Sequence, residues 1–286
     1  PVLYPSTAEF VGTSGTVDGQ VVENIMLDGD IDSSRGELLV TLQPSLASTI
    51  LDSLDYLKAY PYDCTEQTVS RFLPNIVTYN ALTALDLDRP DLEAALPQQV
   101  GLGLQRLYNT QNWDGGWGWW SDDSSDPRLT AYVLLGLSTA RDAGFVVDTW
   151  TLNSAVNYLD SWLADNTART SAQKDTWAEV LYALQASGNT QLDRAVWLYD
   201  EHEGMSHYAK ALLAMTLDNI DKEDTRTSEL LNELVDAAIL DASGVHWEEA
   251  EDSPWAMNTN TRSSAVVLLA IEQLDSENGF LPNAVR

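Results

Sequence analysis

The sequence predicts a mainly α protein, built as an α/α ring of inner and outer helices that follows a short N-terminal β segment. Apolar residues recur at helical spacing over most of residues 44–286, and two segments of this region resemble each other. Residues 1–43 instead are rich in Gly, Thr, Val and Asp, with short alternating runs such as "GELLVTL" that favour strands and turns. We therefore divide the chain into a β-rich segment or linker (1–43) and a helical domain (44–286).

The helical domain is expected to begin directly after Pro44. In "SLASTILDSLDYLKAY", Leu46, Ile50, Leu54 and Leu57 recur every three or four residues and form one apolar face. Stretches such as "LTAYVLLGL" and "AVVLLAI" are apolar on most sides, which is typical of helices buried between neighbours. We expect further helices at 64–86, 91–110, 128–142, 149–165, 172–187, 190–202, 206–218, 225–240 and 260–274.

A weak internal repeat relates residues 116–137 ("GWGWWSDDSSDPRLTAYVLLGL") to residues 245–271 ("VHWEEAEDSPWAMNTNTRSSAVVLLAI"). Each copy has tryptophans, an acidic loop, an arginine and an apolar helix, so that Arg128 aligns with Arg262 and Leu135 with Leu269. Such units suggest stacked helix pairs, and we favour a closed ring over an open solenoid. The turn "QNWDGGWGWW" (111–120) resembles tryptophan-rich turns of terpene cyclases, and we expect it to lock helices together without carrying chemistry.

Composition excludes several classes of partner. The chain has 15 basic and 44 acidic residues, a net charge of −29, which disfavours nucleic acid and anionic membranes. No stretch approaches the roughly 20 apolar residues of a membrane span. A single cysteine excludes an internal disulfide. Because Pro1 is not an initiator residue and no leader follows it, we expect a fragment or a processed form.

The stretch "AYPYDCTEQTVSRFLPNI" (59–76) holds the single cysteine. Asp63 is a good N-cap and Glu66 follows three residues later, so a capping box would make Cys64 the first helical residue. Gln67 then lies on the same helix face, near enough to react with the sulfur. A helix N-terminus stabilises the thiolate as nucleophile and as leaving group. A capped helix with an incidental cysteine remains the alternative, and Pro74 should end or kink this helix.

This stretch resembles the thioester region of the α2-macroglobulin and complement superfamily, and its bacterial members most of all. The family pattern is P-Y-G-C-x-E-Q, followed by P-N-I ten residues after the cysteine. The residues in register are Pro61, Tyr62, Cys64, Glu66, Gln67, Pro74, Asn75 and Ile76. The resemblance covers most of 36–140, including the loop and helix "DGGWGWWSDDSSDPRLTAYVLLGL".

The resemblance implies an α/α toroid, the thioester domain, inserted between strands of a β-domain to which residues 1–43 would contribute. Cys64 Sγ and Gln67 Cδ would be joined as a thioester, with Glu66 in a positioning role and Tyr60 and Tyr62 shielding the bond. No metal or cofactor is implied. After cleavage of a bait region elsewhere in the full protein, amines of the target protease would attack the thioester.

The implied protein is a covalent protease trap of bacterial defence, an inhibitor that acts once rather than a turnover enzyme. Its partners would be target proteases and the rest of the macroglobulin chain, with its flanking β-domain and bait region. Its location would be periplasmic or extracellular. Two departures stand out: Asp63 replaces the family's glycine, and no histidine lies near 176–177, so that amines rather than hydroxyls are the expected targets.

A rival hypothesis is an α/α-ring enzyme, terpene cyclase-like or glycan-active, with an acidic central cavity. Other constellations are weaker. "LDGDIDSS" (27–34) matches only part of a calcium loop and predicts a polar turn. "HEGMSH" (202–207) spaces its histidines five apart, which favours solvated helix ends over a zinc site. "WSDDSSD" (120–126) predicts a helix-capping loop, and nothing local pairs Cys64 with a histidine as in a hydrolase.

Overall fold

Helices dominate the part of the chain that the computed structural model describes, which is residues 64–84, 90–241, 244–250 and 259–283 together with 17, 19–22, 24–25, 27 and 36–42. Two short strands, β1 (Ile239–Asp241) and β2 (Gly244–His246), pair antiparallel, and a 3₁₀ turn spans Leu281–Asn283. The α-helices are α2 (Thr65–Ala84), α3 (Pro90–Thr110), α4 (Pro127–Asp142), α5 (Thr149–Asp165), α6 (Ser171–Ser187), α7 (Leu192–Asp200), α8 (His207–Ile220), α9 (Thr225–Asp236) and α10 (Asn260–Leu274).

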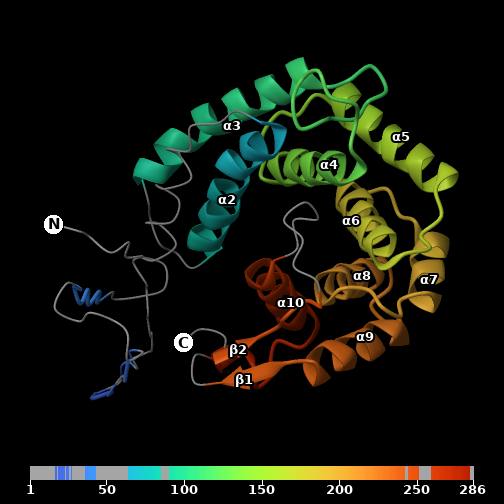
Figure 1. The fold of residues 1–286 in the computed structure, drawn as a ribbon. Coiled ribbons are helices and arrows are strands. Elements are labelled where there is room, and N and C mark those ends of the chain that lie inside the picture. Colours follow the sequence, from blue (N-terminus) through green and yellow to red (C-terminus); the bar gives the residue numbers. More distant parts are fainter. Residues whose placement is uncertain are drawn as a thin grey trace, which may run out of the picture.

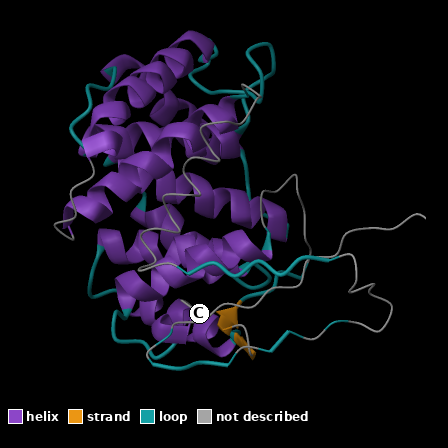
Figure 2. Cartoon of the chain, turned by 90° about the vertical axis from the view of Figure 1, so that its left-hand side faces the viewer, coloured by secondary structure: helices purple, strands orange, loops and turns teal. Residues whose placement is uncertain are grey.

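These helices form the predicted α/α toroid. The inner layer is α2, α4, α6, α8 and α10, each packed against the next, while α3, α5, α7 and α9 lie outside (Figure 1). The strand pair lies at one end of the helical body (Figure 2). Inner helix α8 is buried on nearly all sides from Tyr208 to Asp218, except that Lys210 lies only partly buried. The outer helix α9 buries only three residues, on one face, which explains its stronger amphipathic pattern.

The predicted helices all occur in the described region after residue 64, and two of their boundaries differ instructively. Helix α9 ends at Asp236 rather than near 240, because the residues from Ile239 pair with β2. Helix α2 was expected to end or kink at Pro74, but it continues to Ala84. The expected helix at 45–60, along with Tyr60, Tyr62 and Asp63, lies outside the described residues.

Burial explains why α2 continues past its proline. Val69, Phe72 and Ile76 on either side of Pro74 are completely buried. Burial of Ile76, which follows the proline, contributes about 1.5–3 kcal/mol, comparable to the ~3 kcal/mol cost of an internal proline. Gly103 on α3 makes the close approach possible, since a Cβ there would lie 2.5 Å from the Phe72 ring. The helix therefore follows its tertiary contacts rather than its local propensity.

The tryptophan-rich turn locks α3 to α4, as expected. Trp117 is fully buried, and its indole N–H donates to the carbonyl of Leu107 on α3 at 2.9 Å. Its backbone N–H donates to Thr130 Oγ1 on α4 at 3.0 Å. Asp126 of the acidic loop caps α4 by accepting the backbone N–H groups of Arg128 and Leu129.

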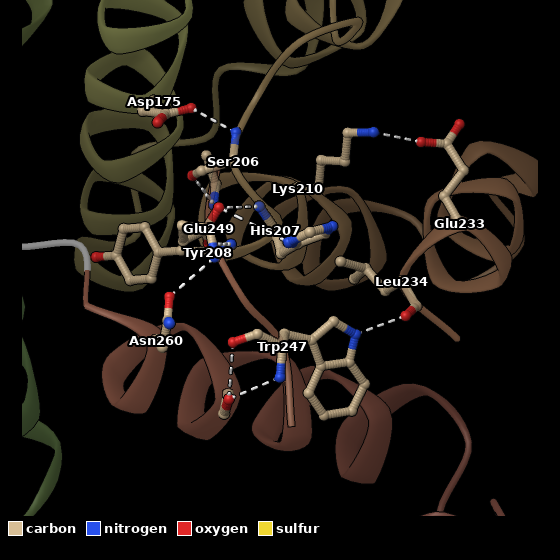
Figure 3. A network of polar contacts seen from close by, with 12 residues as sticks. Asp175, Ser206, His207, Tyr208, Lys210, Glu233, Leu234, Trp247, Glu249 and Asn260 are labelled. Carbon is tan, nitrogen blue, oxygen red and sulfur yellow. Dashed lines mark hydrogen bonds and ion pairs between the residues drawn. The ribbon is translucent and has the colours of Figure 1, made fainter. Parts of the chain in front are cut away.

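The second copy of the repeat builds the same lock between α9 and α10. Trp247 is also fully buried, and its indole N–H donates to the carbonyl of Leu234 on α9 at 2.7 Å (Figure 3). Its backbone N–H donates to Ser264 Oγ on α10 at 2.9 Å. The predicted repeat is therefore real at the level of individual hydrogen bonds.

Residues 36–42, "GELLVTL", are neither helix nor strand, so the strand predicted for them is wrong. A strand needs a neighbour to take its backbone hydrogen bonds, and the described residues offer none to this segment. Leu38, Leu39 and Leu42 are at least 77% exposed. The division of the chain at residue 43 therefore stays a prediction.

Candidate functional site

Cys64 lies at the start of inner helix α2. Its carbonyl accepts the backbone N–H of Thr68 at 3.0 Å, which is the first hydrogen bond of the helix. Cys64 is thus the N-cap residue, and Thr65 is the first helical residue. The predicted start, with Cys64 as the first helical residue, is wrong by one position.

The structure brings Cys64 and Gln67 together on the first turn of α2. The backbone N–H of Gln67 donates to Cys64 Sγ at 3.4 Å, so the sulfur takes the acceptor role that a serine or aspartate oxygen has in an ordinary N-cap. The thiol is buried, with 7% of the residue exposed. Gln67 Oε1 is also buried and has no hydrogen-bond donor among the described residues. The pair therefore forms a sheltered contact between a sulfur and a residue with an amide side chain.

The tryptophan-rich loop holds this helix start in place. The backbone N–H of Thr65 donates to the carbonyl of Trp119 at 3.0 Å, and Thr65 Oγ1 donates to the carbonyl of Gly118 at 2.7 Å. Gly118 is confined, since a Cβ there would lie 2.5 Å from Asp123 Cβ. The loop before α4 thus fixes the residue that follows the cysteine.

Glu66 is held by a chain of hydroxyl groups that sequence reasoning did not find. Ser70 Oγ donates to Glu66 Oε1 at 2.6 Å and lies 3.0 Å from the hydroxyl of Tyr132 on α4. Burial raises the pKa of Tyr132, so this phenol keeps its proton and can donate to Ser70. The Glu66 side chain, next to Gln67 in the sequence, is therefore linked through Ser70 to inner helix α4.

His202 and His207 lie elsewhere, at helix ends as expected, but they are partly buried rather than solvated. His202 stacks on Tyr199 and its Nε2 lies 2.9 Å from Glu233 Oε1, with 22% of its side chain exposed. His207 is 28% exposed and faces Glu249 at 3.7 Å. Within the described ranges, no group of three or more His, Cys, Asp or Glu could hold a metal ion. None of the helices described is long and apolar enough to cross a membrane.

A second polar cluster lies in the centre of the ring. Glu179 on α6 is buried between Arg128 of α4 and Arg262 of α10, at 3.8 and 3.9 Å. Burial raises the pKa of Glu179 to about 7, against the lowering effect of the two arginines. Arg262 also donates to the hydroxyl of Tyr208 at 2.6 Å, and Arg128 Nε donates to Thr176 Oγ1 at 2.7 Å.

This cluster borders a cavity of about 230 Å³ between α4, α6, α8 and α10. Two arginines and one glutamate are its charged lining residues, so the acidic central cavity of the rival hypothesis is wrong for this pocket. The alignment of Arg128 with Arg262 was a signal for the cluster. A lone glutamate within the apolar run "WAEVLYAL" was a second signal, which sequence reasoning passed over.

Comparisons with known proteins find a family match over part of the chain. Residues 38–170 match the family profile described as "A-macroglobulin TED domain". The alpha-2-macroglobulin of Thermotoga maritima is 36% identical over 143 residues, which is 50% of this chain and 8% of the relative. The alpha-2-macroglobulin of Escherichia coli is 30% identical over 175 residues, covering 57% of this chain and 10% of the relative. "Thioester-containing protein 1 allele R1" of Anopheles gambiae is 27% identical over 138 residues, covering 48% of this chain and 10% of the relative.

Solved structures share the fold. Native alpha-2-macroglobulin from Escherichia coli, from domain MG7 to the C-terminus, has a TM-score of 0.67 at 22% identity, covering 82% of this chain and 38% of that one. Salmonella alpha-2-macroglobulin reacted with methylamine has a TM-score of 0.68 at 21% identity, and the match covers 85% of this chain and 16% of that one. This chain spans only 8–10% of the length of the three relatives above. Residues 38–170 thus match the A-macroglobulin TED domain, and the chain is similar to alpha-2-macroglobulins in sequence and shares their fold.

Proposed function

We propose that Cys64 Sγ and Gln67 Cδ form an internal thioester, through which Gln67 is transferred once to an amine of a target protease. The observation that carries this proposal is the 3.4 Å hydrogen bond from the Gln67 backbone N–H to Cys64 Sγ. It keeps the sulfur on the first turn of α2, next to the residue whose side-chain amide would be attacked. The buried, unpaired Gln67 Oε1 supports it as well, since no donor in the described residues holds this amide in another position.

The chemistry balances without a cofactor. The Cys64 thiol adds to Gln67 Cδ and loses its proton, the amide nitrogen leaves as ammonia, and a thioester remains. A protease amine then attacks Cδ, an amide forms, and Cys64 leaves as a thiolate that takes up a proton. The start of α2, with the Gln67 N–H directed at the sulfur, stabilises the negative charge on the leaving group.

The neighbouring side chains support roles in positioning and target choice. Glu66, fixed through Ser70 to Tyr132, would keep the first turn of α2 in place. Thr176 lies near the position at which complement proteins that prefer hydroxyl targets would carry a histidine, and it accepts a hydrogen bond from Arg128. With no imidazole relay at this position, amines remain the expected targets. Tyr60 and Tyr62 remain proposed shields of the bond.

The activity of the whole protein rests on parts outside this chain. Relatives are described as alpha-2-macroglobulin activated by trypsin and by porcine elastase, which supports proteases as partners here. The bait region and the flanking β-domain would lie in the remainder of a longer protein, with residues 1–43 joining that domain. The exposed leucines of 36–42 would pack there. We infer a periplasmic or extracellular inhibitor that acts once and does not turn over.

Intact mass before and after treatment with methylamine tests the thioester. We expect a mass lower than the sequence by one ammonia, then the addition of one methylamine with release of one titratable thiol. A related protein was solved after reaction with methylamine, so the reagent is suited to this fold. Cys64→Ala should abolish both changes, whereas Gln99→Ala, which removes a glutamine on α3, should leave them intact.

Peptide mapping makes the result decisive. A thioester that has already hydrolysed leaves glutamate at position 67, which supports the proposal as the expected product. An unmodified Gln67 together with a thiol that titrates at once, in freshly prepared protein, would overturn it.

A further inference from the structure

The cavity at the centre of the ring includes neither Cys64 nor Gln67, and its two arginines lie toward one end. Arg128 and Arg262 stand near the N-terminal ends of α4 and α10, and both line the cavity. Leu135 and Leu269 line it seven residues further along the same helices. Seven residues of helix rise about 10 Å, which is close to the length of a six-carbon chain with a carboxyl group. The cavity therefore has the length and the polarity gradient of a small amphipathic ligand.

The polar end offers more positive than negative charge. Glu179 Oε2 is buried and accepts no hydrogen bond from any described donor, although both arginines are near. The nearby carboxylates Asp175 and Glu249 do not line the cavity. Both are occupied by the start of α8, where they accept backbone N–H groups (Figure 3). An added anion would thus meet two guanidinium groups, beside a carboxyl group whose Oε2 accepts no hydrogen bond from a described donor.

We propose that this cavity binds a small organic carboxylate with an unbranched apolar tail of about six carbons. The ligand's carboxylate lies between Arg128 and Arg262, where charge-assisted hydrogen bonds are strongest. The tail extends along Leu135, Leu269 and Met215, all of which line the cavity. This site includes neither Cys64 nor Gln67, although Tyr132, which holds Glu66 through Ser70, also lines the cavity.

Binding of the anion should be linked to proton uptake at Glu179. This carboxyl is faced by Arg128 from α4, Tyr208 from α8 and Arg262 from α10, and Asp175 on its own helix adds a negative charge. A second carboxylate beside it favours the protonated form, which can then donate its hydrogen to the ligand. The affinity should therefore fall as the pH rises from about 6 to about 8.

Methionine methyl groups allow a direct test on the unmodified chain. Met215 lines the cavity, whereas the buried Met205 does not and serves as an internal reference. In a titration of protein labelled at the methionine methyl carbons with hexanoate, we expect the Met215 signal to move with a Kd of about 1 mM or below, with Met205 unmoved. Hexanamide, which has no charge, and acetate, which has no tail, should each bind at least about tenfold more weakly.

Two variants separate the tail from the charge. Leu269→Glu places a negative charge beside the tail and should weaken hexanoate about tenfold or more. Leu102→Glu on outer helix α3 is its control, because the two leucines are similarly exposed, at 50% and 62%. Glu179→Gln should keep binding but lose its pH dependence.

Several outcomes would overturn the proposal. One is a Met215 signal that stays fixed in hexanoate at about 10 mM, well above the expected Kd. Another is a signal that moves equally with hexanamide, which would mean a purely apolar pocket. Cys64→Ala should bind hexanoate like the parent chain. If hexanoate does not bind, the thioester proposal is unaffected, and if the thioester is absent, the cavity proposal is unaffected.

Discussion

The two copies of the internal repeat share one skeleton, and they differ in what their loops hold. In each copy a buried tryptophan ties an outer helix to the next inner helix, and an arginine two residues before the bonded hydroxyl faces Glu179. The first loop holds the start of α2 through two backbone carbonyls that accept from Thr65. The second loop holds the start of α8 through the carboxylate of Glu249, which accepts the backbone N–H groups of His207 and Tyr208 (Figure 3).

This difference distinguishes the start of α2, where we propose the thioester, from the start of α8. At α8 the positive end of the helix is neutralised by a carboxylate, as in a structural cap. At α2 the tryptophan-rich loop offers backbone carbonyls and no carboxylate to the first residues of the helix. The backbone N–H of Gln67 is directed at the sulfur of Cys64. The same architecture thus places a carboxylate at the helix start in one copy and a sulfur at the helix start in the other.

The tryptophan locks should give the largest effect. Trp117→Ala and Trp247→Ala should each lower the free energy of unfolding by about 4 kcal/mol, because each opens a large cavity and leaves a buried carbonyl without its indole donor. Urea denaturation measures both, and Trp113→Ala, at a site 97% exposed, is the control with little expected change. A loss below about 1 kcal/mol at one tryptophan would break the equivalence of the two copies.

Glu179, which the arginines of both repeat copies face, should make the free energy of unfolding depend on pH. The folded pKa of Glu179 is raised from 4.5 to about 7 by burial. Between these values the folded chain holds a proton that the unfolded chain has lost, so stability from this group falls as the pH rises toward 7 and is then constant. At ~1.4 kcal/mol per pKa unit, the fall amounts to about 3 kcal/mol.

Glu179→Gln should remove this fall. We expect the difference in unfolding free energy between pH about 5 and about 8 to shrink by up to about 3 kcal/mol relative to the parent chain. Glu272→Gln, an exposed site on α10, keeps the other titrating groups and serves as the control. An unchanged pH difference in the Glu179 variant would mean that both arginines hold this carboxylate ionised.

Much of the fold follows from local patterns in the sequence, and what was missed depends on distant contacts. The helices at 149–165 and 260–274 were predicted with their observed bounds, because periodicity and capping residues agree there. The continuation of α2 past Pro74 depends on burial against α3 and α4, which overrides local propensity. The end of α9 depends on pairing with β2, a contact that periodicity cannot reveal.

The candidate site divides in the same way. The proximity of Cys64 and Gln67 follows from their spacing on one helix, so the sequence was sufficient to predict it. The link from Ser70 to Tyr132 joins residues 62 positions apart. Glu179 has its two arginines on two other helices, so only the assembled ring brings these three together. Contacts of this kind form only when the inner helices have packed against one another.

The smallest effect should distinguish the two helix starts directly. Glu249→Ala leaves two N–H groups of α8 without their carboxylate, at a side chain only 4% exposed, and should cost about 2 kcal/mol. Thr65→Val removes one hydrogen bond but keeps the side-chain volume and the backbone bond to Trp119, so about 1 kcal/mol is expected. Urea denaturation gives both values, with Glu248→Ala, whose side chain is 60% exposed, as the control.

The rate of methylamine incorporation distinguishes a variant that only destabilises a helix start from one that also affects the proposed thioester. Thr65→Val loosens the loop that fixes the residue after Cys64, so it should change the rate of incorporation despite its smaller cost in stability. Glu249→Ala should leave this rate close to that of the parent chain, because it acts at α8 and not at α2. If Glu249→Ala altered the rate as strongly as Thr65→Val, the two helix starts would be coupled through the ring and could not be treated as separate devices.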